Sequence, residues 1–326
     1  MPSSPPPPPS GTPRYALVFK THAWDGFIAR QFERYRSAIG AGDIYVCLDE
    51  TNGQVGPIDA PVLRFTQADL IAMGLADRAE RGSLIWWNTD YPAYLFYAKH
   101  PGYDYYVFCE YDTCIRRGID PLVAEVAAAS ADFVALPTRT ATGDWMWTPF
   151  HLGTYDQAAL AGSLNCISIM SNRAIAMLYR RRIELTHLSE AGRVPFWPIN
   201  EVFLATEIRR AGMKAMSLED FGNADGYEWY PPHLESDLDA DRTHVFLHPV
   251  LDTPRYMASL LKFSPLPGYF HPRARLGRAL RRFPEYRRRL PRAFVARVLM
   301  RSREGYQYIA HRLQRAARRS VLIGKD

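Results

Sequence analysis

The feature of this sequence that most constrains its fold is an alternation of strand-like and helix-like segments over roughly 240 residues. Short apolar runs rich in aromatic and β-branched residues, at 15–20, 43–48 and 132–136, are typical of buried strands. Segments with the apolar spacing of helices lie between them, and the segment 25–39 is followed by Gly40, a residue type that commonly ends a helix. The alternation predicts an α/β sandwich with a mostly parallel central sheet.

Further segments extend the same pattern. The remaining expected strands cover residues 62–65, 103–109, 163–170 and 243–247, and the remaining expected helices cover 87–99, 121–130, 172–185 and 198–211. The chain contains no G-x-G-x-x-G sequence and no Walker loop, which disfavours nicotinamide binding and P-loop chemistry.

The strongest of the expected strands ends in two acidic residues. The run 103–112 is apolar and aromatic until it reaches Glu110 and Asp112. Because successive strand side chains alternate between faces, an extended backbone through Asp112 would place both carboxylates on one face. Paired oxygen ligands at the carboxyl end of a core strand suit a hard divalent cation, at the place where open α/β sheets form their ligand crevice. Surface carboxylates at the exit of a strand are the alternative interpretation.

Composition limits the class of protein. Hydrophobic residues make up 47% of the chain and aromatic residues 13%, enough for a folded core. No apolar run approaches the length that spans a bilayer. Cys47 and Cys109 lie inside strand-like runs, and the four cysteines lack metal-ligand spacing, which predicts reduced thiols and a cytoplasmic location. Residues 1–13 are proline-rich, lack the features of a secretory signal, and are expected to be disordered or polyproline-like.

Charge is distributed unevenly along the chain. Residues 270–326 contain 17 lysines and arginines and 3 acidic residues, a net charge of +14, so residues 1–269 carry −8 of the total of +6. Beyond residue 254 the pattern changes to short, arginine-rich helical segments broken by prolines. We therefore expect a core domain at 14–253 and a basic helical extension at 254–326. A basic face suits an anionic membrane surface, and since the rest of the chain is acidic, nucleic-acid binding is disfavoured.

Two sequence blocks carry a resemblance to a known family. The first is the run 86–91, whose letters are WWNTDY, and the second is the acidic strand 103–112. In these blocks the chain resembles nucleotide-sugar glycosyltransferases of the GT-A type, and among them a loosely defined group with a Glu-Tyr-Asp form of the Asp-x-Asp metal motif. The resemblance covers about residues 14–250. It implies a GT-A-like, Rossmann-type sandwich and a glycosyltransferase activity of the hexosyltransferase class.

The resemblance also implies roles for the acidic pair. Glu110 and Asp112 would stand where the family holds Mn²⁺ or Mg²⁺ against the donor diphosphate, with Asp112 as a catalytic group. Because glutamate replaces the first aspartate, Glu110 would contact the metal, a water on the metal, or the ribose of the donor. The ends of the first two strands would bind the nucleotide, which makes Thr21 and Asp49 candidate donor contacts; ordinary loop polarity explains them equally well.

Two more residues complete the predicted site. Asn200 and Glu201 follow an aromatic segment, and Asn200 is a plausible N-cap with Glu201 in the first helical turn. By the resemblance, Glu201 would be the general base of an inverting enzyme, or would position the acceptor of a retaining one. His248, at the end of the last strand, would be a third metal ligand. A capped helix and a structural histidine are the alternatives. Trp145, Trp147 and Trp197 are candidates for stacking on sugar rings or for core packing.

These inferences together predict a metal-assisted glycosyltransferase of polysaccharide biosynthesis. It would move a sugar from a nucleotide-sugar donor to a glycan or lipid-linked acceptor in the cytoplasm, with residues 270–326 holding it peripherally at the inner membrane face. A nucleotidyltransferase-like enzyme is one rival, although such enzymes usually carry a Gly/Arg/Lys-rich loop after the first strand, and residues 20–25 (KTHAWD) are not one. The other rival is a non-catalytic scaffold that docks through its basic segment.

Overall fold

The computed structural model describes residues 13–138 and 145–302. The predictions for residues 1–12 and 303–326 therefore fall outside the described residues. The described residues form two compact units. The larger unit runs to Glu228 and also includes Ala240–Pro249, and the smaller unit consists of Trp229–Asp239 and the described residues from Val250 onward.

The larger unit is built on a seven-stranded sheet within the described residues, with the strand order β3-β2-β1-β4-β7-β6-β8. Its strands are β1 (Tyr15–Thr21), β2 (Asp43–Asp49), β3 (Val62–Phe65), β4 (Tyr105–Glu110), β6 (Phe133–Pro137), β7 (Ser163–Ser171) and β8 (Ala215–Ser217). Strand β7 runs antiparallel to both of its neighbours, whereas every other described pair in this sheet is parallel. The predicted mostly parallel α/β sheet is confirmed.

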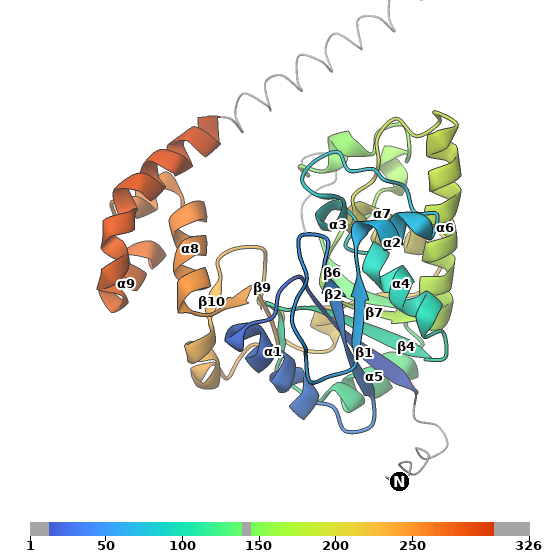
Figure 1. The fold of residues 1–326 in the computed structure, drawn as a ribbon, viewed down its shortest axis with the longest axis horizontal. Helices are drawn as coiled ribbons and strands as arrows, with labels where there is room; N and C mark the ends of the chain where they lie inside the picture. The colour runs from blue at the N-terminus through green and yellow to red at the C-terminus, as the bar shows by residue number, and fades with distance from the viewer. Residues whose placement is uncertain (1–12, 139–144, 303–326) are drawn as a thin grey trace, which may run out of the picture. The chain divides into compact units, whose positions relative to one another are not determined.

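Helices cover both faces of this sheet (Figure 1). One face packs against α2 (Gln67–Ala72), α3 (Leu84–Trp87), α4 (Tyr91–Lys99), α6 (Asn172–Glu190) and α7 (Asn200–Arg210). The other face packs against α1 (Gly26–Ser37) and α5 (Ile119–Ala128). The alternation of β1 explains this layering, because Ala16 and Val18 enter one core and Leu17 and Phe19 enter the other.

A smaller sheet lies beyond the end of β4. In the described residues it has the order β5-β11-β9, from β5 (Cys114–Ile115), β11 (Phe246–His248) and β9 (Gly226–Tyr227). The expected strand at 243–247 therefore begins later, at Phe246. Asp241 accepts hydrogen bonds from the backbone N–H groups of Thr243 and His244, at 2.9 and 3.2 Å, and so holds those residues in a turn.

The expected continuous helix at 87–99 is wrong, because it is broken between α3 and α4. The Asn88 side chain donates to the carbonyl oxygens of Leu84 and Arg78, each at 2.9 Å, and Asn88 ends α3. Asp90 then caps α4, with Pro92 in its first turn. Asn200 also differs from expectation. Ile199 is the N-cap of α7 and Asn200 is its first helical residue.

The smaller unit is mainly helical. It contains β10 (His233–Leu234) paired with β12 (Val250–Leu251), the helices α8 (Thr253–Phe263) and α9 (Arg275–Arg282), and a further helix over 290–302. Met257 and Leu260 of α8 pack against Leu276 and Leu280 of α9 in a core of their own. The predicted helical character beyond residue 254 agrees with these elements. No helix in the described part of the chain is long and apolar enough to cross a membrane.

Candidate functional site

The candidate site starts where the order of the main sheet reverses. From β1 the chain adds β2 and β3 on one side, whereas β4 pairs on the other side, and the crevice of an open α/β sheet forms at such a switch point. Lys20 and Glu110 are register partners at the ends of β1 and β4. The Lys20 Nζ lies 3.3 Å from the Glu110 Oε1 and 3.5 Å from the carbonyl oxygen of Thr89. The switch point therefore carries a cation and an anion side by side.

Asp112 reaches the site from a turn rather than from the strand. Strand β4 ends at Glu110, and the Thr113 N–H donates to the Glu110 carbonyl oxygen at 3.0 Å, which closes a turn over Tyr111 and Asp112. The Thr113 hydroxyl donates to the same carbonyl at 2.6 Å. The expected extended backbone through Asp112 is therefore wrong, and strand alternation does not bring the two carboxylates together. The turn determines where Asp112 lies.

His248 arrives from the smaller sheet. Strand β11 pairs with β5, which begins two residues after Asp112, and the His248 Nε2 lies 3.8 Å from the Asp112 Oδ2. The His248 Nδ1 lies 2.8 Å from the Glu228 carbonyl oxygen. Because a carbonyl oxygen only accepts hydrogen bonds, Nδ1 is the donor in this contact, which leaves Nε2 facing the site. A backbone partner of this kind is how proteins commonly orient a metal-binding histidine.

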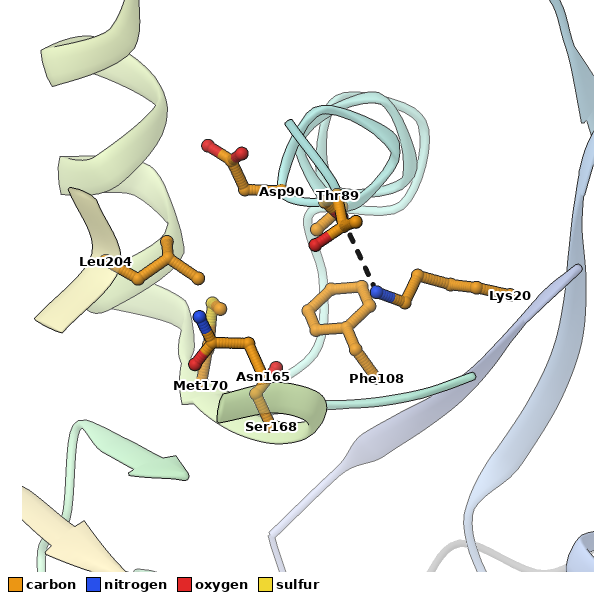
Figure 2. A pocket seen from close by; sticks show the side chains of 9 residues that line it. Lys20, Thr89, Asp90, Phe108, Asn165, Ser168, Met170 and Leu204 are labelled. Carbon is orange, nitrogen blue, oxygen red and sulfur yellow. Dashed lines mark hydrogen bonds between the residues drawn. The ribbon is translucent and has the colours of Figure 1, made fainter. Parts of the chain in front are cut away.

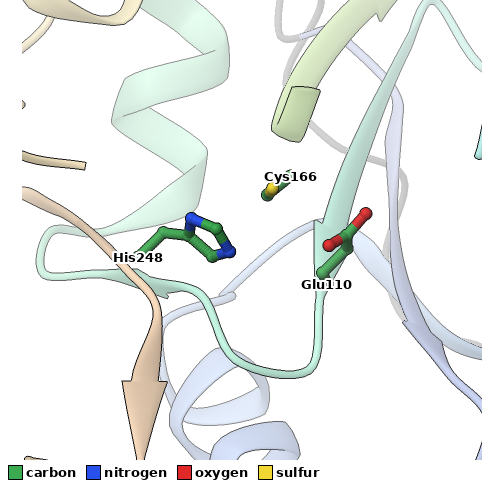
Figure 3. Close-up of side chains that lie close together, drawn as sticks. All are labelled: Glu110, Cys166 and His248. Carbon is green, nitrogen blue, oxygen red and sulfur yellow. The ribbon is translucent and has the colours of Figure 1, made fainter. Parts of the chain in front are cut away.

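Cys166 joins the same group of side chains. Ligand atoms of Glu110, Cys166 and His248 all lie within 4.8 Å of one another, and Figure 3 shows these side chains converging from β4, β7 and β11. The register between β6 and β7 shifts between Val134 and Leu136, opposite this part of β7. Such irregularities redirect side chains next to functional sites.

The electrostatics of the group fit a bound cation. Burial raises the pKa of Asp112, and the charge of Glu110 adds to this effect while His248 opposes it. The Asp112 Oδ1 is buried and has no hydrogen-bond partner among the described residues. Burial also acts to raise the pKa of Glu110, but Lys20 and His248 outweigh it and hold that pKa below its usual value. The site thus holds a carboxylate oxygen that lacks a partner and an imidazole nitrogen that is oriented to bind.

Glu201 lies in the first turn of α7 with its carboxylate beside Trp147. The Trp147 Nε1 donates to the Glu201 Oε2 at 2.7 Å. Burial raises the pKa of Glu201 to about 7, and the negative charge of Glu110 contributes to the increase. The negative charge of Glu201 in turn contributes to raising the pKa of Cys166, mainly a result of burial. Glu201 is therefore electrostatically linked to the cluster formed by Glu110, Cys166 and His248.

A buried polar network fixes the segment that leads into α7. The Trp87 Nε1 donates to the Trp197 carbonyl oxygen at 3.0 Å, and the Trp197 Nε1 donates to the Asn88 Oδ1 at 2.8 Å. The Asn200 side chain donates to the Trp87 carbonyl oxygen at 3.3 Å and accepts from Asn165 at 3.3 Å. The aromatic segments around residues 87 and 197 therefore interlock, and this interlocking sets the start of α7 and the position of Glu201.

Arg182 of α6 is the centre of this network. Its guanidinium makes two bonds to the carboxylate of Asp90, at 2.7 and 3.2 Å, and one to the Pro198 carbonyl oxygen at 3.0 Å. It also stacks over Phe203, 3.7 Å from the ring centroid. Both charged side chains are fully buried. A paired, hydrogen-bonded charge of this kind is costly to disrupt, which makes Arg182 a strong positioning element beneath the site.

The remaining predicted residues lie apart from the cluster. The Thr21 hydroxyl is buried and exchanges hydrogen bonds with the backbone of Ala23, at 2.8 and 3.3 Å. Asp49 accepts from the Thr51 N–H at 2.8 Å in the loop after β2. Both residues lie at strand ends beside the switch point. Their predicted contacts with a nucleotide-sugar donor stay predictions.

The tryptophans divide between core and surface. Trp197 is completely buried by the network and has no exposed face for a sugar. Trp145 packs over Gly162, where a Cβ would come within 2.4 Å of the indole ring. Trp147 is buried beside Glu201 and contacts Trp86, which is 51% exposed, at a centroid distance of 6.0 Å. Trp86 is the aromatic side chain of this group that a ligand can reach.

A small cavity lies behind Lys20 (Figure 2). Phe108, Asn165 and Leu204 contribute to its lining, and the space suffices for about one water molecule. Asn165 and Ser168 both line it although they are three residues apart, which is consistent with the irregularity in β7. A cavity of this size holds no sugar or nucleotide. It separates Lys20 from α7 within the core.

Three residues of the site were not assigned a role from the sequence. Lys20 stood in a candidate loop, yet only the β1–β4 register shows that it pairs with Glu110. Cys166 carried no metal-ligand spacing, because its partners are 56 and 82 residues away along the chain. Arg182 is the last of three consecutive arginines in α6. Its helical spacing from the buried Leu178 and Leu185 is the signal that marks it as facing the core.

Comparisons with known proteins identify no family. No family model matches the chain, and no curated protein sequence matches it. Among solved structures, the chain is similar to mouse xyloside xylosyltransferase 1 in its apo form. The identity is 8% and the TM-score is 0.43, and the alignment covers 72% of this chain and 97% of the other. The geometry of the site itself is therefore the basis for assigning a function.

Proposed function

We propose that this protein is a metal-assisted glycosyltransferase that moves a sugar, of the hexosyltransferase class, from a nucleotide-sugar donor to a glycan or lipid-linked acceptor. The observation that carries the proposal is the meeting of Glu110, Asp112 and His248 at the switch point of the sheet, with the raised-pKa carboxyl of Glu201 electrostatically linked to them. Ligand sites of open α/β sheets form at that place. A separate acid whose pKa is raised by burial supports this proposal, because perturbed carboxyls gather at functional sites.

The donor set fits a divalent cation. Glu110, Asp112 and His248 would hold it, with the Asp112 Oδ1 gaining the partner that it lacks in the described structure. A bound divalent cation supplies neutralisation of the negative charge that develops on a departing diphosphate. Lys20 adds a second positive charge beside Glu110. Thr21 and Asp49, at the neighbouring strand ends, would contact the nucleotide.

Glu201 would receive the proton of the acceptor hydroxyl in an inverting reaction. A general base works best when its pKa lies near the operating pH, and the pKa of Glu201 is about 7. The bond from Trp147 would hold the carboxylate in one orientation, and Trp86 lies next to Trp147 with half of its surface exposed. In a retaining reaction the same carboxylate would position the acceptor.

The proposal is tested by nucleotide binding and donor hydrolysis. Titration calorimetry with Mn²⁺ and with UDP, GDP or CMP should detect metal-dependent binding to the full chain. Asp112→Asn should abolish metal-dependent hydrolysis of the matching nucleotide sugar and leave the melting temperature nearly unchanged. Asp156→Asn, the same chemical change at an exposed acid outside the site, should retain activity. Absence of binding by every nucleotide to the folded protein would favour the scaffold interpretation instead.

The smaller unit would dock the enzyme at an anionic membrane surface. In the helix over 290–302, Arg292, Val295 and Leu299 share one face by their spacing, and Val295 and Leu299 are each 57% exposed. Exposed apolar residues beside arginines are typical of helices that lie in the interface of anionic bilayers. A peripheral position at the inner membrane face would bring the site to a lipid-linked acceptor.

Liposome flotation tests this docking. The wild type should bind vesicles that contain anionic lipid, and the double variant Val295→Ser/Leu299→Ser should lose most of this binding. Vesicles of neutral lipid should bind neither the wild type nor the double variant. Met146→Ser removes an equally exposed apolar side chain from the larger unit and serves as the control. Equal flotation of the double variant and the control would contradict a role for this helix face.

A further inference from the structure

We propose that Cys166 makes the cluster selective for a thiophilic divalent cation, so that Zn²⁺ or Co²⁺ binds through Cys166, His248 and Glu110 in preference to Mg²⁺ or Mn²⁺. The role of the metal in this inference rests on the proposed function. The binding of the metal does not. Its basis is the geometry of the three side chains and the chemistry of their donor atoms (Figure 3).

The geometry is close to that of a three-ligand metal site. The Glu110, Cys166 and His248 ligand atoms lie within 4.8 Å of one another. Bond lengths of about 2.0–2.3 Å to zinc give ligand-to-ligand separations of roughly 3.5 Å in a tetrahedron, so each separation needs to shorten by at most about 1.3 Å. The Glu110 side chain is 26% exposed and ends in a flexible arm, which allows this closure. The Cys166 thiol is among the groups that lower the pKa of the Glu110 carboxyl, after Lys20 and His248.

The donor atoms determine which metal is preferred. Magnesium takes oxygen ligands in octahedral geometry and has little affinity for sulfur, whereas zinc combines cysteine, histidine and carboxylate in one site. A thiolate ligand therefore moves the preference toward zinc and its spectroscopic substitute cobalt. The Nδ1 bond from His248 to Glu228 supplies the orienting partner that such histidines usually have.

The site also leaves room for a fourth ligand. Three protein ligands with one open position are the usual arrangement of catalytic zinc, while structural zinc sites are closed by four. Asp112 lies 3.8 Å from the His248 Nε2 and either fills the fourth position or stays beside it. Lys20, which now pairs with Glu110 at 3.3 Å, would compete with the metal for that carboxylate. Weakening this pair and releasing the thiol proton of Cys166 are both costs of binding.

Cobalt titration of the full chain tests the proposal directly. Co²⁺ bound by a thiolate gives an intense near-ultraviolet charge-transfer absorption that oxygen and nitrogen ligands do not produce. We expect this band in the wild type and in Cys114→Ala, which removes another buried free thiol, and we expect its loss in Cys166→Ala. Zn²⁺, measured by competition, should bind the Cys166→Ala variant at least about 100-fold more weakly, since loss of an outer partner alone costs 10–100-fold.

A second measurement needs no variant. Zn²⁺ should slow alkylation of Cys166 in the folded wild-type protein by at least about tenfold, as mapped by mass spectrometry, whereas Mg²⁺ at the same concentration should not. An unchanged alkylation rate together with an absent cobalt band would overturn the proposal, even if Cys166→Ala failed to fold.

The outcomes also separate this inference from the proposed function. Mn²⁺-dependent nucleotide binding without a cobalt–thiolate band would retain the glycosyltransferase proposal and refute the role of Cys166. A cobalt–thiolate band in a protein that binds no nucleotide would support the metal site and refute the transferase. If the protein binds no nucleotide and gives no cobalt–thiolate band, both the glycosyltransferase proposal and the metal-site proposal are refuted.

Discussion

Replacing Glu201 by glutamine tests the electrostatics of the candidate site without any knowledge of the substrate. The pKa of Glu201 is raised from 4.5 to about 7, chiefly by burial. Each unit of pKa difference between the folded and unfolded states corresponds to about 1.4 kcal/mol, so the protonated carboxyl contributes about 3.5 kcal/mol to the free energy of unfolding relative to the ionised form. Because the folded pKa is raised, this stability is fully present below pH 4.5 and is lost as the pH rises through about 7.

The variant should therefore differ from the wild type in its pH dependence. Glutamine stays neutral and can still accept the bond from Trp147. Between pH 5 and pH 8 the wild type should lose about 2.5 kcal/mol relative to Glu201→Gln, which corresponds to a change of about 5 °C in the difference between their melting temperatures. At pH 8 the variant should be the more stable protein.

Thermal unfolding of both proteins at pH 5, 6, 7 and 8, in a buffer with a chelator, measures this difference. Glu190→Gln, at an exposed acid at the end of α6, is the control and should follow the wild-type profile. A melting-temperature difference between Glu201→Gln and wild type that does not change with pH would refute the reasoning. It would mean that Glu201 is solvated and ionised in the folded protein throughout this range.

Two other expectations follow from the same region. If Glu201 is the general base, the transfer rate should rise as the pH passes through about 7 and Glu201 loses its proton, and Glu201→Gln should lower product formation by at least about 100-fold. Arg182→Met should reduce the free energy of unfolding by about 3–5 kcal/mol, because it leaves the carboxylate of Asp90 buried without its partner, and the double variant Arg182→Met/Asp90→Leu should recover much of this loss in urea unfolding. A flat pH–rate profile, or an Arg182→Met variant as stable as the wild type, would contradict the respective expectation.

The strands of the main sheet were predictable because local apolar runs determine them. Residues 15–20, 43–48 and 62–65 lie within or coincide with observed strands, and the run at 15–20 is buried on both faces between helical layers. The break at Asn88 has a local signal in Asp90 and Pro92, which begin the next helix. The partners that hold Asn88 and Asp90 are distant, because Trp197 donates to Asn88 and Arg182 binds Asp90 across 92 residues of chain.

The candidate site was predictable in its parts but not in its assembly. Glu110 was marked as the end of a strong strand and His248 as the end of a late one. Cys166 was counted only as a cysteine without metal spacing. Its neighbours come from β4 and β11, so its role appears only once the pairing of strands is known. Residues that converge from separate strands are the usual content of a site in this kind of sheet.

The charge of the cluster gives a reason for an added cation that is independent of any resemblance. Lys20 contributes +1, and Glu110 and Asp112 contribute −1 each when ionised, so these three side chains together carry a net charge of −1. A diphosphate would be repelled by this site, because like charges within a few ångströms in a partly buried region cost several kcal/mol. With a divalent cation the net charge becomes +1, and the same residues attract the donor. Metal should therefore bind before the nucleotide, and nucleotide affinity should depend on metal concentration even where no sugar is transferred.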